Sequence, residues 1–213
     1  MNKIVFGLRH GERADRHFTN RPNLIKYDPC LTEKGLIQAQ QSAERIRNLV
    51  PNGLSMHVVC SPFLRTIETA SFVSKAFGVP LHVEKGFGEM LLDFDFPSNP
   101  VNTLKFFNKK EDLQKELGCE LVENKHLTEA KFPESVEQGY NRVIQNWNNY
   151  FTSVNSDVYI VVTHLYVLGA LSQVWLGRDF MVHDENYCKL TMAKYNGHHY
   201  KVELLCDHSH ATQ

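Results

Sequence analysis

Short apolar runs alternate along the chain with longer stretches in which apolar residues recur at helical spacing. The apolar runs predict buried strands at 3–9, 57–60, 81–84 and 158–162. The helical spacing predicts amphipathic helices over 33–49, 62–77, 136–151 and 165–175. An alternation of strands and helices favours a parallel sheet whose crossover connections are right-handed.

Polar residues and glycines mark the ends of these predicted helices. Thr32 is suited to cap the helix over 33–49, and Pro51-Asn52-Gly53 ends it. Ser61 and Pro62 suit the N-cap and the first position of the next helix, and Gly78 suits its end. Each predicted helix therefore fits between two predicted strands.

The C-terminal part of the chain has a different pattern. Residues 188–195 and 199–206 flank Asn196-Gly197, which predicts a β-hairpin with a type I′ turn. The expected fold class is thus α/β: a three-layer α/β/α sandwich with a mostly parallel mixed sheet and a C-terminal antiparallel hairpin.

Two segments show no simple period. Residues 10–31 read as a long polar loop, and a loop of this length is usually functional. Residues 85–134 hold one or two helices over about 104–117, with Gly118 as a stop signal. We expect one domain over 1–213, with an insertion or lid at about 85–134.

Composition narrows the function classes. The 213 residues carry 23 Lys+Arg and 24 Asp+Glu, a net charge of −1, which gives no basic field for nucleic acid or a membrane surface. We find neither a secretory signal nor a transmembrane run. The five scattered cysteines form no CxxC pair, which favours a reduced, cytoplasmic protein without a zinc site. Any anion must therefore be bound by a local cluster.

Such a cluster is predicted where the strands end. Arg9 and His10 end the first strand, Arg65 follows the second, Glu89 follows the third, and His164 follows the strand at 158–162. Parallel strands bring their carboxyl ends to one edge of the sheet. Arginines suit tetrahedral oxyanions, a neutral His10 is a nucleophile, and Glu89 could protonate a leaving oxygen. These residue types point to phosphoryl transfer.

Four motifs carry a resemblance to a known family. Arg9-His10-Gly11-Glu12-Arg13 resembles the RHG signature of branch 1 of the histidine phosphatase, or phosphoglycerate-mutase-like, superfamily. The segment from Leu31-Thr32 to Gln38-Ala39 resembles the family's LTxxGxxQA helix, and 61–70 resembles its SPxxRxxxTA segment. Glu89 and Thr163-His164 occupy the expected later positions. Four motifs in the family's order make the resemblance specific.

The resemblance implies a role for each of these residues. His10 would attack phosphorus and become phosphohistidine, while Arg9, Arg65 and His164 would bind phosphoryl oxygens. Glu89 would act as general acid and then as general base toward water, and no metal or other cofactor is implied.

Two residues distinguish this chain within the family. The RHGER pattern resembles the Sts-type phosphatases and their eukaryotic relatives, in which Arg13 would be a further phosphate or substrate contact. The family's second histidine is usually followed by a small residue, whereas Leu165 follows His164 here.

Other interpretations stay open at this point. A phosphoglycerate-type mutase and a weakly catalytic phospho-ligand binding module are the alternatives to a phosphatase. Asp93 and Asp95 are alternative acids, and we expect Glu12 to be a structural partner of an arginine. The substrate could be a phosphorylated small molecule or a phosphoprotein, and a homodimer is compatible with the sequence. Histidines and a cysteine near the C-terminus are better explained by a disordered tail than by a metal site (His198, His199, Cys206, His208 and His210).

Overall fold

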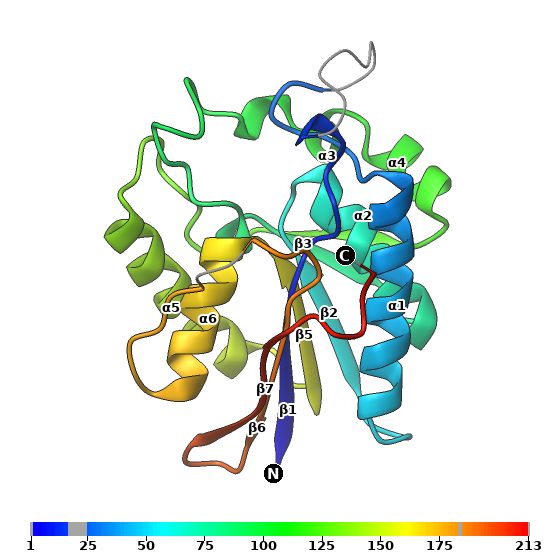
Figure 1. Cartoon of the computed structure of the whole chain (residues 1–213), viewed down its shortest axis with the longest axis vertical. Coiled ribbons are helices and arrows are strands. Elements are labelled where there is room, and N and C mark those ends of the chain that lie inside the picture. Colours follow the sequence, from blue (N-terminus) through cyan, green and yellow to red (C-terminus); the bar gives the residue numbers. More distant parts are fainter. Residues whose placement is uncertain (1, 17–24, 183–184, 213) are drawn as a thin grey trace.

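The computed structural model describes residues 2–16, 25–182 and 185–212. Within them, a seven-stranded sheet lies between two layers of helices (Figure 1). The strands are β1 (Lys3–Arg9), β2 (Met56–Cys60), β3 (Leu81–Glu84), β4 (Leu121–Asn124), β5 (Val158–Thr163), β6 (Leu190–Tyr195) and β7 (Tyr200–Asp207). The α-helices are α1 (Glu33–Leu49), α2 (Leu64–Phe77), α3 (Lys105–Asn108), α4 (Lys110–Leu117), α5 (Val136–Ser153) and α6 (Leu165–Leu176). Short 3-10 helices are η1 (Ala14–Arg16), η2 (Lys85–Phe87) and η3 (Val101–Thr103).

The strand order is β4-β3-β2-β5-β1-β6-β7. The pairs from β4 to β1 are all parallel, whereas β6 pairs antiparallel with β1 and with β7. The predicted fold class is therefore confirmed: the sheet is mostly parallel, ends in an antiparallel pair and is flanked by helices.

Each central strand is apolar on both faces because both faces are covered. In β1, Phe6 belongs to the core cluster that includes Ile46 of α1 and Ile67 of α2. Its neighbour Val5 belongs to the cluster that includes Trp147 of α5 and Trp175 of α6. Figure 1 shows α1 and α2 on one side of the sheet and α5 and α6 on the other. Among the described residues, no helix is long and apolar enough to cross a membrane.

The start of α2 differs from the prediction. Ser61 is not its N-cap, because the helix begins at Leu64 with Phe63 at the cap position. The Leu64 amide instead donates to the Asp28 carboxylate at 2.6 Å. A cap supplied by a residue 36 positions earlier in the chain leaves Ser61 available for a different contact. By contrast, α1 begins as predicted, with the Thr32 side chain accepting from the Gly35 amide at 2.9 Å.

The segment 85–134 contributes to the sheet as well as to the helices. Its helices α3 and α4 occupy the predicted range, and Gly118 ends α4 in a left-handed conformation (φ 64°). It also supplies β4, an edge strand that the sequence pattern did not predict, which pairs in parallel with β3. Whether this segment acts as a lid stays a prediction.

The C-terminal hairpin forms, but its turn is not of type I′. Tyr195 pairs with Tyr200, so four residues make the loop, and of Asn196 and Gly197 only Gly197 has a positive φ (102°). A type I′ turn needs a positive φ at both central residues.

Residues 208–212, which follow β7, are also ordered, contrary to the expected disordered tail. The His210 ring lies 3.1 Å from the Ser42 hydroxyl of α1, and the Thr212 amide donates to Gln41 at 2.9 Å. Figure 1 shows this end of the chain beside α1. The described residues include no group of three or more His, Cys, Asp or Glu side chains that could hold a metal ion.

Candidate active site

The predicted site residues meet at the carboxyl edge of the sheet. Arg9 ends β1, and the His10 amide donates to the Thr163 carbonyl at 3.0 Å, which ties the nucleophile candidate to the end of β5. His164 precedes α6, Arg65 lies in the first turn of α2, and Glu89 follows η2. Four parallel strands thus bring together side chains that lie up to 155 positions apart in the sequence.

The His10 ring is buried and held in one orientation. Its Nδ1 lies 2.7 Å from the Gly11 carbonyl, to which it donates, and its Nε2 accepts from Arg65 Nε at 3.3 Å. Burial, reinforced by Arg65 and Arg9, holds the pKa of His10 well below its usual value. The ring is therefore neutral at pH 7, with its lone pair on Nε2, which is the nucleophilic form of histidine.

Arg65, Glu89 and His164 form a compact cluster beside this ring. The Glu89 carboxylate lies 3.2 Å from Arg65 Nη2 and 3.0 Å from His164 Nδ1. Burial acts to raise the pKa of Glu89, but His164, Arg65 and Arg13 outweigh burial and lower it to about 2. Glu89 is thus a carboxylate in the site without substrate.

His164 is positioned by a serine that sequence reasoning assigned to a helix cap. The Ser61 hydroxyl lies 2.7 Å from His164 Nε2. Burial lowers the pKa of His164 to about 4, and its ring is therefore neutral at pH 7. A neutral ring that donates from Nδ1 to Glu89 accepts at Nε2 from the Ser61 hydroxyl. The position of Ser61 directly after a buried strand was the signal that could have revealed this contact.

Two buried guanidinium donors at this site have no hydrogen-bond partner among the described residues. Neither Arg9 Nε nor Arg65 Nη1 makes a hydrogen bond to the described residues. The other end of the Arg9 guanidinium is fixed: its Nη1 donates to the Asn186 carbonyl at 3.0 Å, and its Cζ lies 4.8 Å from the Tyr187 ring centre. Buried donors are nearly always satisfied in proteins, so these two point to an anionic ligand.

Arg13 lines the cavity above His10, and its guanidinium is paired with Asp15. Its Nε and Nη2 both donate to the Asp15 carboxylate at 2.6 Å. The predicted contact between Arg13 and phosphate therefore requires that Arg13 shares its donors with Asp15 or moves away from it.

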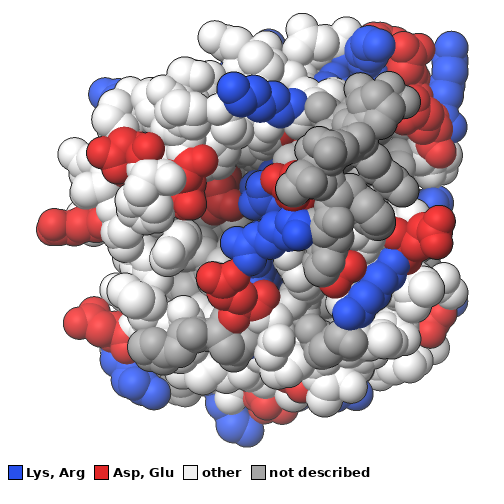
Figure 2. Space-filling view, turned by 45° about the horizontal axis from the view of Figure 1, so that its top comes forward, with Lys and Arg blue, Asp and Glu red and all other residues white. Residues whose placement is uncertain are grey.

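The cavity above His10 has a volume of about 310 Å³. Its walls come from the loops that follow β1 and η2, from the start of α6 and from Glu185. Leu165, the bulky residue after His164, is one of its lining residues. Figure 2 views the molecule from this end and shows basic and acidic side chains next to one another near the middle of the face. Asp95 lines the cavity and Asp93 does not, so of the two alternative acids only Asp95 lies at the candidate site.

A close backbone contact holds the His10 segment against α1. A Cβ on Gly11 would lie 2.5 Å from the Gly35 carbonyl oxygen, and one on Gly35 would lie 2.3 Å from the Glu12 carbonyl oxygen. Only glycine allows this approach. The Glu12 carboxylate accepts from the Thr32 hydroxyl at 2.8 Å and lies 3.6 Å from Lys34. Glu12 thus contacts the N-terminal turn of α1.

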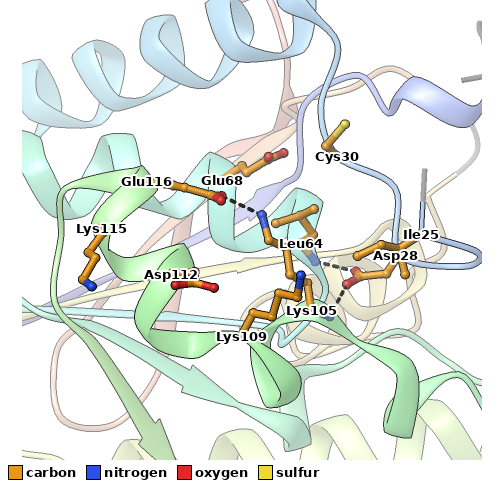
Figure 3. A pocket seen from close by; sticks show the side chains of 10 residues that line it. All are labelled: Ile25, Asp28, Cys30, Leu64, Glu68, Lys105, Lys109, Asp112, Lys115 and Glu116. Carbon is orange, nitrogen blue, oxygen red and sulfur yellow. Dashed lines mark hydrogen bonds and ion pairs between the residues drawn. The ribbon is translucent and has the colours of Figure 1, made fainter. Parts of the chain in front are cut away.

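A second cavity, of about 810 Å³, lies between α2, α4 and the segment around Asp28 (Figure 3). Asp28 accepts from the amides of Leu64 and Lys105, and Glu68 accepts from the Leu31 amide at 2.6 Å. Burial raises the pKa of Glu68 to about 7. These carboxylates fix the start of α2, which carries Arg65, to the segment before α1.

Comparison with known proteins places this fold and site in a family. The sequence pattern of the histidine phosphatase superfamily (branch 1) matches residues 5–208, and the chain therefore belongs to this superfamily. No curated protein sequence matches the chain.

Solved structures with the same fold include enzymes of two kinds. A phosphoserine phosphatase from Entamoeba histolytica in complex with phosphoserine is 16% identical, with 98% of each chain covered and a TM-score of 0.64. The ecdysone phosphate phosphatase from Bombix mori in complex with tungstate is 19% identical, with 94% of this chain and 91% of that chain covered and a TM-score of 0.64. A phosphoglycerate mutase from Bacillus anthracis str. Sterne is 18% identical, with 98% and 95% covered and a TM-score of 0.65. At these identities, the likeness shows a shared fold.

Proposed function

We propose that the protein is a phosphatase that hydrolyses a phosphate monoester through a phosphohistidine on His10. The observation that carries this proposal is the pair of unpartnered buried donors, Arg9 Nε and Arg65 Nη1, beside a neutral histidine. A phosphoryl group bound there would have its oxygens on guanidinium groups and its phosphorus near the His10 lone pair. His164 is the third group of this cradle.

In the first step, His10 Nε2 attacks phosphorus, a nitrogen–phosphorus bond forms and the bond to the ester oxygen breaks. The leaving oxygen takes a proton from Glu89. His164 and Arg65, which lie next to Glu89, keep it a carboxylate before substrate binds. An incoming dianion competes for both groups, which raises the pKa of Glu89 and lets it carry that proton.

In the second step, Glu89 is again a carboxylate and takes a proton from water as the water oxygen attacks phosphorus. The nitrogen–phosphorus bond breaks, and the electron pair returns to His10 Nε2. Inorganic phosphate leaves, and Glu89 keeps the proton taken from water for the next cycle or loses it to solvent. We assign this role to Glu89 rather than Asp95 because Glu89 contacts Arg65 and His164 directly.

We also propose that Arg13 is a phosphate or substrate contact and that the chain belongs with the Sts-type RHGER phosphatases. Support comes from the place of Arg13 on the cavity wall and from its Coulombic effect on Glu89. Phosphate binding would use an Arg13 donor that the Asp15 carboxylate does not take, so that the pair with Asp15 is kept.

The test is to trap the intermediate. Mixing the protein with an aryl phosphate and quenching within milliseconds should give an acid-labile phosphoprotein, which the His10→Ala variant does not form. The His198→Gln variant, changed at an exposed hairpin histidine, is the control and should form it normally. Normal hydrolysis by His10→Ala would rule out the mechanism.

The same samples separate the alternative functions. A mutase would return the phosphoryl group to 3-phosphoglycerate rather than to water. A binding module would bind phosphate or vanadate but hydrolyse no ester.

A further inference from the structure

The outer half of the cavity holds charges that largely cancel one another. Arg13 pairs with Asp15 at 2.6 Å, and Arg16 pairs with Glu185 at the mouth. An anionic group on the far end of a substrate could form an ion pair with Arg13 or Arg16 only by breaking one of these existing pairs. The outer cavity therefore disfavours a second anion.

Asp95 is the carboxylate of the outer cavity that takes part in neither of these ion pairs. Its side chain lines the cavity and makes no hydrogen bond or ion pair with any residue of the described parts of the chain. The turn that carries it is fixed, because the amides of Asp95 and Phe96 both donate to the Leu92 carbonyl, at 3.1 and 3.0 Å. Burial and the charge of Glu89 raise the pKa of Asp95. A cation placed next to this carboxylate would relieve that repulsion.

Aromatic rings line the same part of the cavity. Phe96 is buried, and its ring meets the Tyr27 ring edge to face at a centroid distance of 5.9 Å. Tyr166, from the first turn of α6, adds a third ring to the wall. Aromatic faces next to a carboxylate are the chemistry that recognises ammonium groups. Carboxylate and rings thus favour the same kind of ligand.

We propose that the substrate is a small phosphate monoester whose alcohol part carries an ammonium group, bound by Asp95 and the rings of Tyr27 and Phe96. The inference rests on the proposed function, in which the phosphate lies on His10 at the inner end. A cavity of about 310 Å³ is at the small end of the range for ligand pockets and suits a compact ester. Asp95 is then a specificity-determining residue.

The test uses two esters of the same shape. Phosphocholine has a trimethylammonium group where 3,3-dimethylbutyl phosphate has an uncharged tert-butyl group. We expect the wild-type kcat/KM for phosphocholine to exceed that for the uncharged ester about tenfold, as an ammonium contact with a carboxylate and aromatic faces predicts. The Asp95→Asn variant should bring this ratio close to one. Asp93→Asn, changed at the exposed neighbour that does not line the cavity, is the matched control and should keep the wild-type ratio.

Each other outcome contradicts the inference in a recognisable way. Equal kcat/KM values for the two esters would overturn it. An equal loss for both esters in Asp95→Asn would instead assign Asp95 to the phosphate end or to proton transfer. Hydrolysis of p-nitrophenyl phosphate without a preference for the cationic ester would overturn the inference and leave the proposed function standing. Hydrolysis of none of the three esters would overturn both.

Discussion

Arg65 Nε lies 3.3 Å from His10 Nε2, so the arginine proposed to bind the phosphoryl group donates to the lone pair of the proposed nucleophile. This contact fixes the tautomer of His10 with its proton on Nδ1. In the proposed mechanism, phosphate binding and release of the lone pair are therefore one event. His10 could attack only after the arginine donor has turned to a phosphoryl oxygen.

The first prediction concerns that arginine. Arg65→Lys should lower kcat/KM for an aryl phosphate by about 100-fold or more, because one ammonium cannot serve His10, Glu89 and the phosphoryl group together. Steady-state kinetics and vanadate binding measure the effect. Arg47→Lys, at the exposed end of α1, should behave like wild type. A loss of less than tenfold at position 65 would show that the planar guanidinium is dispensable.

The second prediction concerns the support of His164. Ser61→Ala removes the hydroxyl at Nε2, so the ring loses the contact that orients it toward Glu89. We expect kcat/KM to fall about 3- to 10-fold, which corresponds to the loss of one hydrogen bond. Ser71→Ala, a buried serine of α2 whose hydroxyl bonds to the Glu68 carbonyl, controls for general loss of stability. Equal effects of the two variants on activity would show that Ser61 does not position His164 for the reaction.

The third prediction concerns pH and stability. Burial raises the pKa of Glu68 to about 7, so the folded state holds a proton that the unfolded state releases above its ordinary value of 4.5. This contribution stabilises the fold at low pH and is lost as the pH rises from 4.5 to 7. Glu68→Gln keeps an acceptor for Leu31 without the charge. It should raise the free energy of unfolding by about 1–3 kcal/mol at pH 8 and change it little at pH 4.5.

Urea unfolding at the two pH values measures this difference. Glu44→Gln, on the exposed face of α1, serves as the control and should show no such pH dependence. If Glu68→Gln raised the free energy of unfolding equally at both pH values, the raised pKa of Glu68 would be contradicted.

The fourth prediction concerns the glycine contact behind His10. Gly35→Ala places a Cβ 2.3 Å from a backbone carbonyl, which cannot move without shifting the His10 segment. We expect a loss of about 2 kcal/mol or more in the free energy of unfolding, together with reduced activity. Gly139→Ala is the matched helical control, because its Cβ would meet only the flexible Met90 side chain. Thermal unfolding of both variants should show the larger loss at Gly35.

The sequence predicted most of the architecture because its signals are local. The strands β1 and β3 and the helix α1 follow directly from apolar spacing and the Thr32 cap. The meeting of His10, Arg65, Glu89 and His164 followed from one further rule, that parallel strands end at one edge.

The features that were missed depend on partners far away in the chain. Asp28 caps α2 across 36 positions, and this long-range cap is what leaves Ser61 beside His164. The four-residue strand β4 contains Glu123 and Asn124, and it is too short and too polar to be predicted from its apolar pattern. The C-terminal residues are ordered by Gln41 and Ser42 of α1, which no local pattern around His210 could indicate.

The pairing of β1 with β5 has a consequence for how the protein is made. His10 is synthesised long before Thr163, the residue to which its amide bonds, and β6 completes the other side of β1 only after residue 190. Pairings of such long sequence separation form late and slowly. A ribosome-bound chain that stops before β5 would therefore carry His10 without its surroundings. If the proposed mechanism holds, activity should appear only after β5 and β6 have left the ribosome.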